Sequence, residues 1–219
     1  MNLDFSSVLP SFPYILKGVG VTLQIAFFAG VIGFLGGIIL SLFKISNVKV
    51  LNWLADAYTS IFRGTPLVLQ LMIIYFGSPQ IIGYQIDPFI AAVISFGLNS
   101  TAYISEIIRG GILGIDKGQS EAAMALGVPY RPMMINIVLP QAVKNILPAL
   151  MNEFITLTKE SAIVTTIGVM DVMRRAYQVG ADKFRFIEPL LLAGIIYYVL
   201  VMFLSLIGKA VERRLRKGD

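Results

Sequence analysis

The stretch "GVGVTLQIAFFAGVIGFLGGIILSLF", residues 18–43, decides the fold because it holds 26 consecutive residues without a charge. About 20 predominantly apolar residues are enough for a helix to cross the hydrocarbon core of a bilayer. Since this run is longer than that minimum, it predicts a membrane-spanning helix near the start of the sequence.

The composition of the whole chain agrees with a membrane protein. Of its 219 residues, 56% are hydrophobic and 14% are charged, whereas soluble domains carry about 25% charged residues. The sequence contains no cysteine and no histidine, so it has no thiolate and lacks the commonest metal ligand and general base. We therefore expect no catalytic residue, no metal site and no enzyme activity of its own.

Four later apolar stretches predict further spanning helices, so residues 1–219 are expected to form one all-α transmembrane domain. The five predicted spans cover about residues 18–43, 53–79, 86–112, 133–158 and 187–209. Lys144 and Glu153 interrupt the fourth span. Five spans, an odd number, would put the two ends of the chain on opposite sides of the membrane.

Lysine and arginine residues predict the orientation in the membrane. Segments on the side of the C-terminus would hold nine of them and segments on the other side five, and positive residues are enriched on the cytoplasmic side. We therefore expect an outer N-terminus and a cytoplasmic C-terminus. A basic cluster follows the last span, which is typical of a membrane flank and not of a nucleic-acid site. It consists of Lys209, Arg213, Arg214, Arg216 and Lys217.

The first span carries small residues at four-residue spacing, which lets another helix approach closely in lipid. They are Ala29, Gly33, Gly37 and Ser41. The contact is either with another helix of the same chain or with a second copy, and the spacing leaves both open.

Two short helices are predicted outside the spans. Residues 161–186 are expected to form an outer loop with a short amphipathic helix. On the inner side a polar helix is predicted over about residues 117–127, because Asp116 and Gln119 form a capping-box pattern and Gly127 suits the left-handed position after a helix. It would be roughly 15 Å long, too short to cross a bilayer. It either caps the bundle at the membrane surface or enters a groove on a partner protein.

The segment "EAAMALGVPYRPMMINIVLP", residues 121–140, resembles the EAA loop of ABC-importer permeases. That pattern is Glu-Ala-Ala, three residues, Gly, nine residues and Ile-x-Leu-Pro. The matching positions are Glu121, Ala122, Ala123, Gly127, Ile137, Leu139 and Pro140. The resemblance implies that the short polar helix is a coupling helix that docks in a cleft of a cytoplasmic ATPase. The residues expected to carry this coupling are Glu121, Ala122, Ala123 and Gly127.

Other stretches are similar to the polar amino acid permeases of the histidine/glutamine type. They are "GVGVTL" at 18–23, "FRGTPLVLQ" at 62–70, "AYISEIIRGGI" at 102–112 and "NEFITLTKESAI" at 152–163. The resemblance covers about residues 10–212. Members often have Asp and then Thr or Ser after the lysine of the last stretch, where this chain has Glu160 and Ser161.

The resemblance implies a type I ABC-importer permease in the bacterial cytoplasmic (inner) membrane. Its implied partners are a cytoplasmic ABC ATPase dimer, an extracytoplasmic amino acid-binding protein and the amino acid itself. Five spans are too few for a complete pathway with two gates, so we expect a second, identical permease chain. The sequence has no G-x-x-x-x-G-K-[ST] loop, so ATP and magnesium are expected on the ATPase and no cofactor on this chain.

Polar residues within the spans are candidates for a transport path, since such groups usually face a cavity or a partner. The candidate substrate contacts are Gly64, Thr65, Leu67, Asn99, Glu153, Glu160 and Ser161. Pro66 lacks a backbone donor, so the segment 64–66 predicts either a kinked span or a broken helix whose freed backbone groups line the path. Asn99 is either a hydrogen-bonding link between helices or a ligand contact.

Glu153 and Glu160 lie seven residues apart and so share one face of a helix. Either Glu153 pairs with Arg63 or Lys144, or the two carboxylates bind the positive groups of an amino acid, most simply a basic one.

Glu106 and Arg109, three residues apart on the third span, are expected to form a structural or gating ion pair.

The resemblance, together with these features, implies the permease subunit of an ATP-driven importer for polar, basic amino acids. The alternatives are a passive channel or secondary carrier for small polar solutes, and a membrane anchor that transports nothing.

Overall fold

The structure is a computed structural model that describes residues 3–216, so Lys217 of the basic tail lies outside the described residues. The described part of the chain folds into helices. The long ones are α2 (Gly18–Ile45), α3 (Lys49–Gly64), α4 (Leu67–Ile82), α5 (Pro88–Leu113), α8 (Leu139–Glu160) and α10 (Ile187–Arg216). The short ones are η1 (Leu9–Ser11), α1 (Phe12–Leu16), α6 (Lys117–Ala125), α7 (Tyr130–Met133), η2 (Met134–Val138), η3 (Ser161–Ile167) and α9 (Val172–Lys183).

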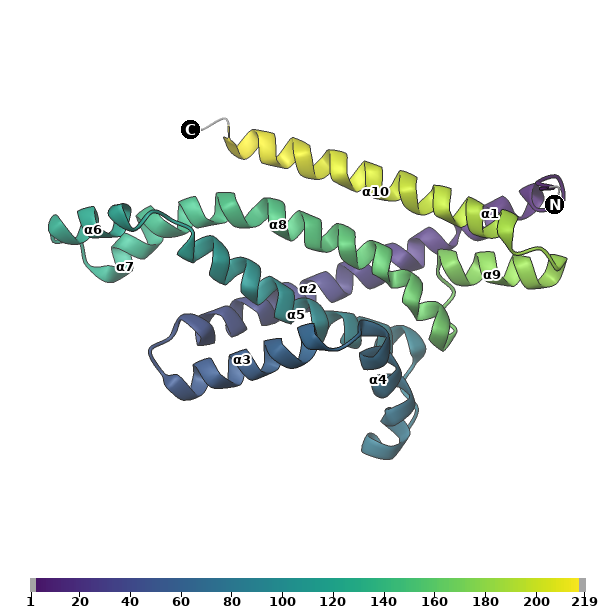
Figure 1. Ribbon diagram of the computed structural model, residues 1–219, viewed down its shortest axis with the longest axis horizontal. Coiled ribbons are helices and arrows are strands. Elements are labelled where there is room, and N and C mark those ends of the chain that lie inside the picture. Colours follow the sequence, from purple (N-terminus) through teal and green to yellow (C-terminus); the bar gives the residue numbers. More distant parts are fainter. Residues whose placement is uncertain (1–2, 217–219) are drawn as a thin grey trace.

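Most of the long helices run lengthwise in an elongated molecule, whereas α4 turns away from that direction (Figure 1). The N-terminus, α1 and α9 lie at one end, while α6, α7 and the C-terminus lie at the other. The turn that joins α2 to α3 lies toward the α6 end. Termini at opposite ends agree with an odd number of crossings.

Helix length and composition give four stretches that could cross a bilayer. They are Leu9–Ile45, Pro88–Leu113, Tyr130–Ile167 and Ile187–Arg214. A fifth arises if α3 and α4 are counted as one broken span, since the two helices are bent by 99° at their junction. The stretch expected as one span over about 53–79 therefore consists of two helices. Pro66 explains the break, because it lacks an N–H and forces the preceding Thr65 into an extended conformation.

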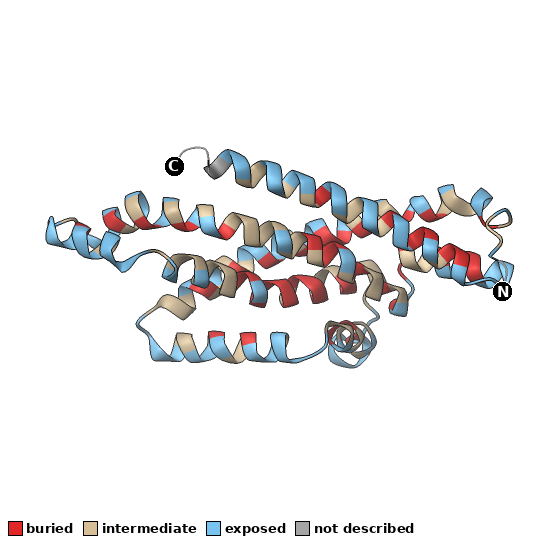
Figure 2. Ribbon diagram, turned by 45° about the horizontal axis from the view of Figure 1, so that its top comes forward, coloured by how far each residue is buried: buried red, intermediate tan, exposed pale blue. Residues whose placement is uncertain are grey.

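The centre of the bundle is the contact between α2 and α5. A Cβ added to Gly33 would lie 2.7 Å from Ser100 Cβ, and one added to Gly37 would lie 2.6 Å from Ile104 Cγ2. The small residues of the first span therefore pack within the chain, which decides between the two possibilities left open by their spacing. Figure 2 shows buried residues concentrated along the central helices, whereas α3 is mostly exposed.

Hydrogen bonds close both ends of α6. Asp116 accepts a hydrogen bond from a backbone amide of the first turn. At the other end Gly127 has a φ of +72°. The amides of Gly127 and Val128 donate to the carbonyls of Met124 and Ala123 at 2.9 and 3.0 Å, which are the two bonds of a Schellman motif. These bonds hold α6 as a short, well-defined helix at its end of the molecule.

Asp171 ties the elements at the opposite end together. Its carboxylate accepts from the amide of Arg174 at 2.8 Å and so caps α9. It also accepts from Tyr197 of α10 at 2.9 Å and from Thr165 of η3 at 3.3 Å. Burial raises the pKa of the Asp171 carboxyl, and the hydrogen bonds it accepts oppose that shift. One buried side chain thus joins η3, α9 and α10.

Candidate functional site

The break between α3 and α4 leaves a backbone carbonyl without its helical donor. Pro66 has no N–H to give to the carbonyl of Phe62, four residues earlier. Gln70 Nε2 donates to this oxygen at 2.9 Å, and Asn99 Nδ2 of α5 donates to it at 3.0 Å. Asn99 also donates to Gln70 Oε1 at 3.0 Å. We call the buried side-chain amides of Gln70 and Asn99 the amide clamp. In this structure Asn99 therefore links α5 to α3 and α4.

The residues of the break itself differ in accessibility. Gly64 and Thr65 are exposed, and a Cβ added to Gly64 would meet no atom within 4 Å. Thr65 Oγ1 donates to the carbonyl of Ile61 at 2.8 Å and accepts from Gln70 at 2.9 Å. Leu67 is half-buried and packs against the main core. Of these three candidate substrate contacts, Gly64 and Thr65 face open space and Leu67 belongs to the packing.

Glu153 lies in the middle of α8 and contacts α5. Ser100 Oγ donates to Glu153 Oε1 at 2.8 Å, and Ser100 is fully buried where α2 and α5 meet. Because Asn99 and Ser100 are neighbours, α5 holds the amide clamp with one side chain and Glu153 with the next. Glu153 also lines a groove of about 310 Å³ between α2, α5 and α8, whose other lining residues are apolar or glycine.

The cations considered as partners of Glu153 lie elsewhere. The guanidinium carbon of Arg63 lies 5.3 Å from the centroid of the Tyr103 ring, a cation–π contact. Lys144 precedes Glu153 by nine residues, roughly 13 Å along a helix. Among residues 3–216 no cation forms an ion pair with Glu153, so the partner seen in this part of the chain is a hydroxyl group.

Glu160 and Ser161 lie where α8 passes into η3. Glu160 follows Glu153 by seven residues, roughly 10 Å along the helix, and is partly exposed. Ser161 is buried, and its hydroxyl donates to the carbonyl of Thr158 at 2.8 Å. Glu160 is therefore accessible to a ligand, whereas the hydroxyl of Ser161 is engaged by its own backbone.

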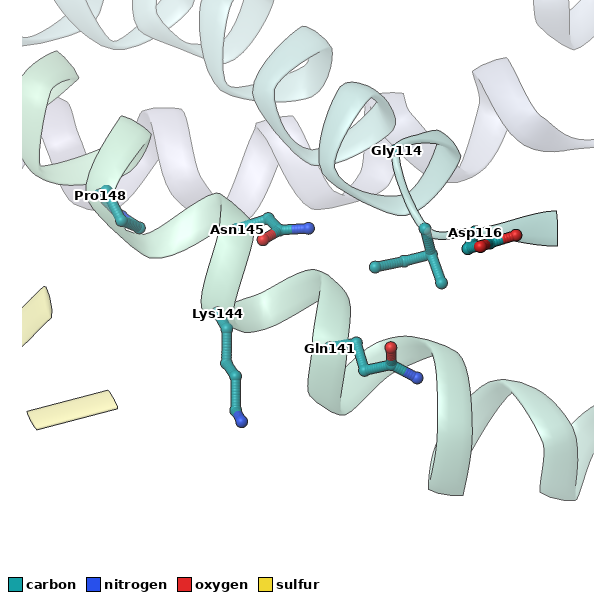
Figure 3. A pocket seen from close by; sticks show the side chains of 7 residues that line it. Gly114, Asp116, Gln141, Lys144, Asn145 and Pro148 are labelled. Carbon is teal, nitrogen blue, oxygen red and sulfur yellow. The ribbon is translucent and has the colours of Figure 1, made fainter. Parts of the chain in front are cut away.

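A polar cavity of about 840 Å³ opens at the α6 end of the molecule, between α8 and the turn after α5. Its lining residues are Gly114, Ile115, Asp116, Gln141, Lys144, Asn145 and Pro148. Figure 3 shows the side-chain amides of Gln141 and Asn145 directed from α8 toward that turn. From the first residue of α8 to its last, the cavity, Glu153 and Glu160 follow one another, so one helix carries polar groups over its whole length.

Glu106 and Arg109 form an ion pair that is part of a larger network. Arg109 Nη2 and Nε donate to Glu106 Oε2 at 2.8 and 3.1 Å. The other oxygen of Glu106 accepts from Lys44 Nζ at the end of α2. Lys44 also donates to Asp56 and Thr59 of α3, at 2.9 and 2.8 Å. The network, which we call the lysine network, joins α2, α3 and α5.

The segment around α6 presents an exposed surface. Ala123 is the buried residue of α6 and fixes the helix to the rest of the molecule. Leu126 has 83% of its surface exposed, and it stands among other exposed residues. These are Glu121, Ala122, Met124, Gly127 and Tyr130. Exposed apolar side chains gathered in this way mark a contact with a protein or with the membrane.

Three residues shape the site although the sequence analysis did not assign them to it. Gln70 is a polar residue four positions after Pro66 in an apolar stretch, which could have suggested a donor for the freed carbonyl. Ser100 follows Asn99 near the middle of a predicted span, which marks it as polar within the membrane but does not indicate Glu153 as its partner. Lys44 gave no comparable signal, because its role depends on residues far away in the sequence.

Comparison with known proteins identifies relatives along the whole chain. The sequence model of a family described as "Binding-protein-dependent transport system inner membrane component" matches residues 8–217. The arginine transport system permease protein ArtQ of Bacillus subtilis (strain 168) is 63% identical over 219 residues, which is 100% of both chains. The putative glutamine transport system permease protein GlnP of Rickettsia felis is 48% identical over 206 residues, 94% of both chains.

Solved structures show the same fold. A chain in the crystal structure of an amino acid ABC transporter with histidines superposes with a TM-score of 0.93 at 42% identity, covering 98% of this chain and 100% of that one. A chain of the MetNI methionine ABC transporter in an inward-facing conformation has a TM-score of 0.77 at 22% identity, covering 94% and 98%. With the family match over nearly its full length, the chain belongs to the binding-protein-dependent transport system inner membrane components.

Proposed function

We propose that this chain is the membrane-spanning permease subunit of an ATP-driven importer of polar, basic amino acids. Membership of the family supports a permease, and the relatives named as arginine and glutamine permeases support an amino acid as cargo. The observation that carries a basic cargo is Glu153. It is a carboxylate in the middle of α8 that, among the described residues, has a hydroxyl partner and no ion pair.

The chemistry of this carboxylate suits a cationic side chain. A charge within a spanning segment costs free energy unless a partner compensates it. Ser100 satisfies one position on Oε1 and leaves Oε2 available as an acceptor. The planar guanidinium of arginine offers several donors in a fork that matches a carboxylate. Glu160, roughly 10 Å further along α8, would supply a second negative charge on the same route.

The segment around α6 is proposed to dock in a cytoplasmic ATPase and to transmit its movement. The support is a short helix closed at both ends, with exposed Glu121, Met124 and Leu126. The ATPase dimer would bind ATP and Mg²⁺, and this chain would hydrolyse nothing itself. With α6 and the C-terminus cytoplasmic, the N-terminus lies outside the bacterial cytoplasmic membrane. An extracytoplasmic binding protein would deliver the amino acid at the α9 end.

The transport path is proposed to be completed by a second, identical chain. Asn145, Asn152 and Lys159 follow one another at seven-residue spacing on α8, so they lie on one face. All three are exposed in the single chain. Facing lipid would be costly for such groups, so a second copy and the water-filled path between the two would cover this face.

The proposal is tested in liposomes that contain the permease, its ATPase and its binding protein. Uptake of labelled arginine is measured with and without MgATP, for the unmodified chain and for Glu153→Gln. Lys49→Met is the control, because it removes an exposed charge at the start of α3, away from the α9 end where the binding protein would dock. We expect ATP-dependent uptake that Glu153→Gln lowers about tenfold or more, as loss of a charged hydrogen-bond partner does, and that Lys49→Met leaves unchanged.

Three results would contradict parts of the proposal. Arginine flux through liposomes that contain this chain alone, without ATP, would indicate a passive channel or secondary carrier. Absence of uptake in the intact ATP-supplied complex would refute transport of arginine. Equal uptake by Glu153→Gln and the unmodified chain would remove the role of Glu153 while leaving ATP-driven import in place.

A further inference from the structure

Lys44 is buried although it is a charged residue at the end of a spanning helix. Its side chain is 4% exposed. Its ammonium group donates to Asp56 Oδ1, Thr59 Oγ1 and Glu106 Oε1, which uses all three of its N–H donors. A buried charge is tolerated only when it is paired and hydrogen-bonded. Lys44 is therefore held in one place, and it holds its three partners in turn.

The partners of Lys44 belong to two helices, which also meet at the amide clamp and at the cation–π contact between Arg63 and Tyr103. Asp56 and Thr59 are three residues apart on one face of α3, and Glu106 is on α5. Other side-chain hydrogen bonds also attach α3 to α2 and α5. Asn52 Nδ2 donates to two carbonyls at the end of α2 at 3.0 and 2.9 Å, and Tyr58 donates to a carbonyl of α5 at 2.8 Å.

The side of α3 that faces away from the other helices is largely exposed, and Figure 2 shows few buried residues on this helix. Ala55 and Thr59 are its buried residues. By contrast, α2 and α5 meet in close contacts between small side chains. The position of α3 relative to α5 thus depends on a few directional contacts, and among the hydrogen bonds those of Lys44 carry charge.

The lysine network lies between two parts of the proposed machinery. On α5, Glu106 precedes the end of the helix by seven residues, roughly 10 Å, and α6 begins four residues after that end. On α3, Thr59 precedes Gly64 at the break by five residues, roughly 7 Å. A displacement of α6 that moves the end of α5 therefore reaches α3 first through the bonds of Lys44, because Glu106 is seven residues nearer to that end than Asn99 of the amide clamp.

We propose that Lys44 is a positioning residue that ties α3 to α5, so that movement of α6 is transmitted to the break between α3 and α4. The inference rests on the proposed docking of α6 to an ATPase. Lys44 touches neither ATP nor the amino acid in this role. Loss of the Lys44 side chain should therefore leave ATP hydrolysis in place. It should lower the amount of amino acid taken up per ATP hydrolysed.

The first test measures arginine uptake and ATP hydrolysis in the same liposomes. Lys44→Met removes the charge, Lys44→Arg keeps it, and Lys49→Met removes an exposed lysine five residues later. We expect Lys44→Met to lower uptake per ATP by about fivefold or more, the lower range of coupling between sites. Lys44→Arg should recover most of this loss, and Lys49→Met should equal the unmodified chain. An unchanged ratio in Lys44→Met, or an equal loss in Lys49→Met, would overturn the inference.

A second readout does not depend on the cargo. Hydrogen exchange of residues 60–66 is followed in the permease–ATPase complex with and without MgATP. A nucleotide-dependent change in the unmodified chain and Lys44→Arg, lost in Lys44→Met, supports the inference even if arginine is not transported. The same change in all three variants would overturn it.

If Lys44→Met does not assemble with the ATPase, Asp56→Asn decides the question by both readouts. It removes the negative charge of one acceptor of the network, whose side chain is 69% exposed, and leaves Lys44 paired with Glu106. A lower uptake per ATP and a smaller nucleotide-dependent change in exchange are expected, and unchanged values of both would refute the inference.

Discussion

The amide clamp gives the sharpest prediction about stability, because the two possible roles of Asn99 lead to different results. Asn99→Leu keeps the size of the side chain and removes both of its donated hydrogen bonds. The carbonyl of Phe62 retains Gln70 as a donor, but Gln70 Oε1 is left buried without its partner. Asn99 is 6% exposed, so water does not replace the lost bonds easily.

The cost can be worked out from these bonds. A buried acceptor left without a partner costs about 1–3 kcal/mol, so we expect a loss of about 2 kcal/mol in the free energy of unfolding. For a chain of this length, each kcal/mol lowers the unfolding temperature by about 2–4 °C. The midpoint should therefore fall by about 4–8 °C.

The assay is thermal unfolding of the purified permease–ATPase complex in detergent. Asn47→Leu is the matched control, since it replaces an asparagine that is exposed in the turn between α2 and α3. If Asn99 were only a ligand contact, Asn99→Leu would unfold at the same temperature as the control and lose arginine binding instead. Equal midpoints for Asn99→Leu, the control and the unmodified chain would refute the reasoning about the clamp.

The other predictions concern glycines and a helix cap. Gly33→Val places a Cβ 2.7 Å from Ser100 and should cost about 1–3 kcal/mol by overpacking. The cost is measured as a lower unfolding temperature. Gly20→Val is the control and should not lower it, because no atom lies within 4 Å of a Cβ added there. Gly127→Ala puts a Cβ on a residue with φ +72°, a conformation that costs L-residues about 1–2 kcal/mol, so uptake per ATP should fall; normal uptake would argue against a coupling role for the end of α6. Asp116→Ala should cost about 1 kcal/mol of helix stability and speed hydrogen exchange in α6, and unchanged exchange would show that the cap is dispensable.

The helical architecture can be predicted from the sequence, because the length and hydropathy of an apolar run are local properties of the chain. The apolar runs predict all-α membrane-spanning structure, and family membership and the solved relatives confirm it. The structure begins α6 at Lys117 and ends it at Ala125, two residues before the predicted end, and Asp116 and Gly127 act on their own neighbours in the chain.

The candidate site was less predictable because it depends on contacts between distant residues. Pro66 indicates a defect in a helix, but the 99° bend depends on how α4 packs on α5. Asn99 carries no mark that distinguishes a donor to Phe62 from a ligand contact. From the sequence, Lys44 is predicted as an ordinary positive residue at the cytoplasmic end of a span. Its role is visible only in the structure, where α3 and α5 place the carboxylates of Asp56 and Glu106 beside it.

The central claim is that the membrane-spanning chain itself recognises a basic amino acid through Glu153. Equilibrium binding of labelled arginine to the purified permease–ATPase complex, without any binding protein, tests it most directly. We predict saturable arginine binding that Glu153→Gln weakens about tenfold or more, and that Lys49→Met leaves unchanged. Binding of equal strength in Glu153→Gln, or no arginine binding by an intact complex, would contradict the claim and place selectivity in the binding protein.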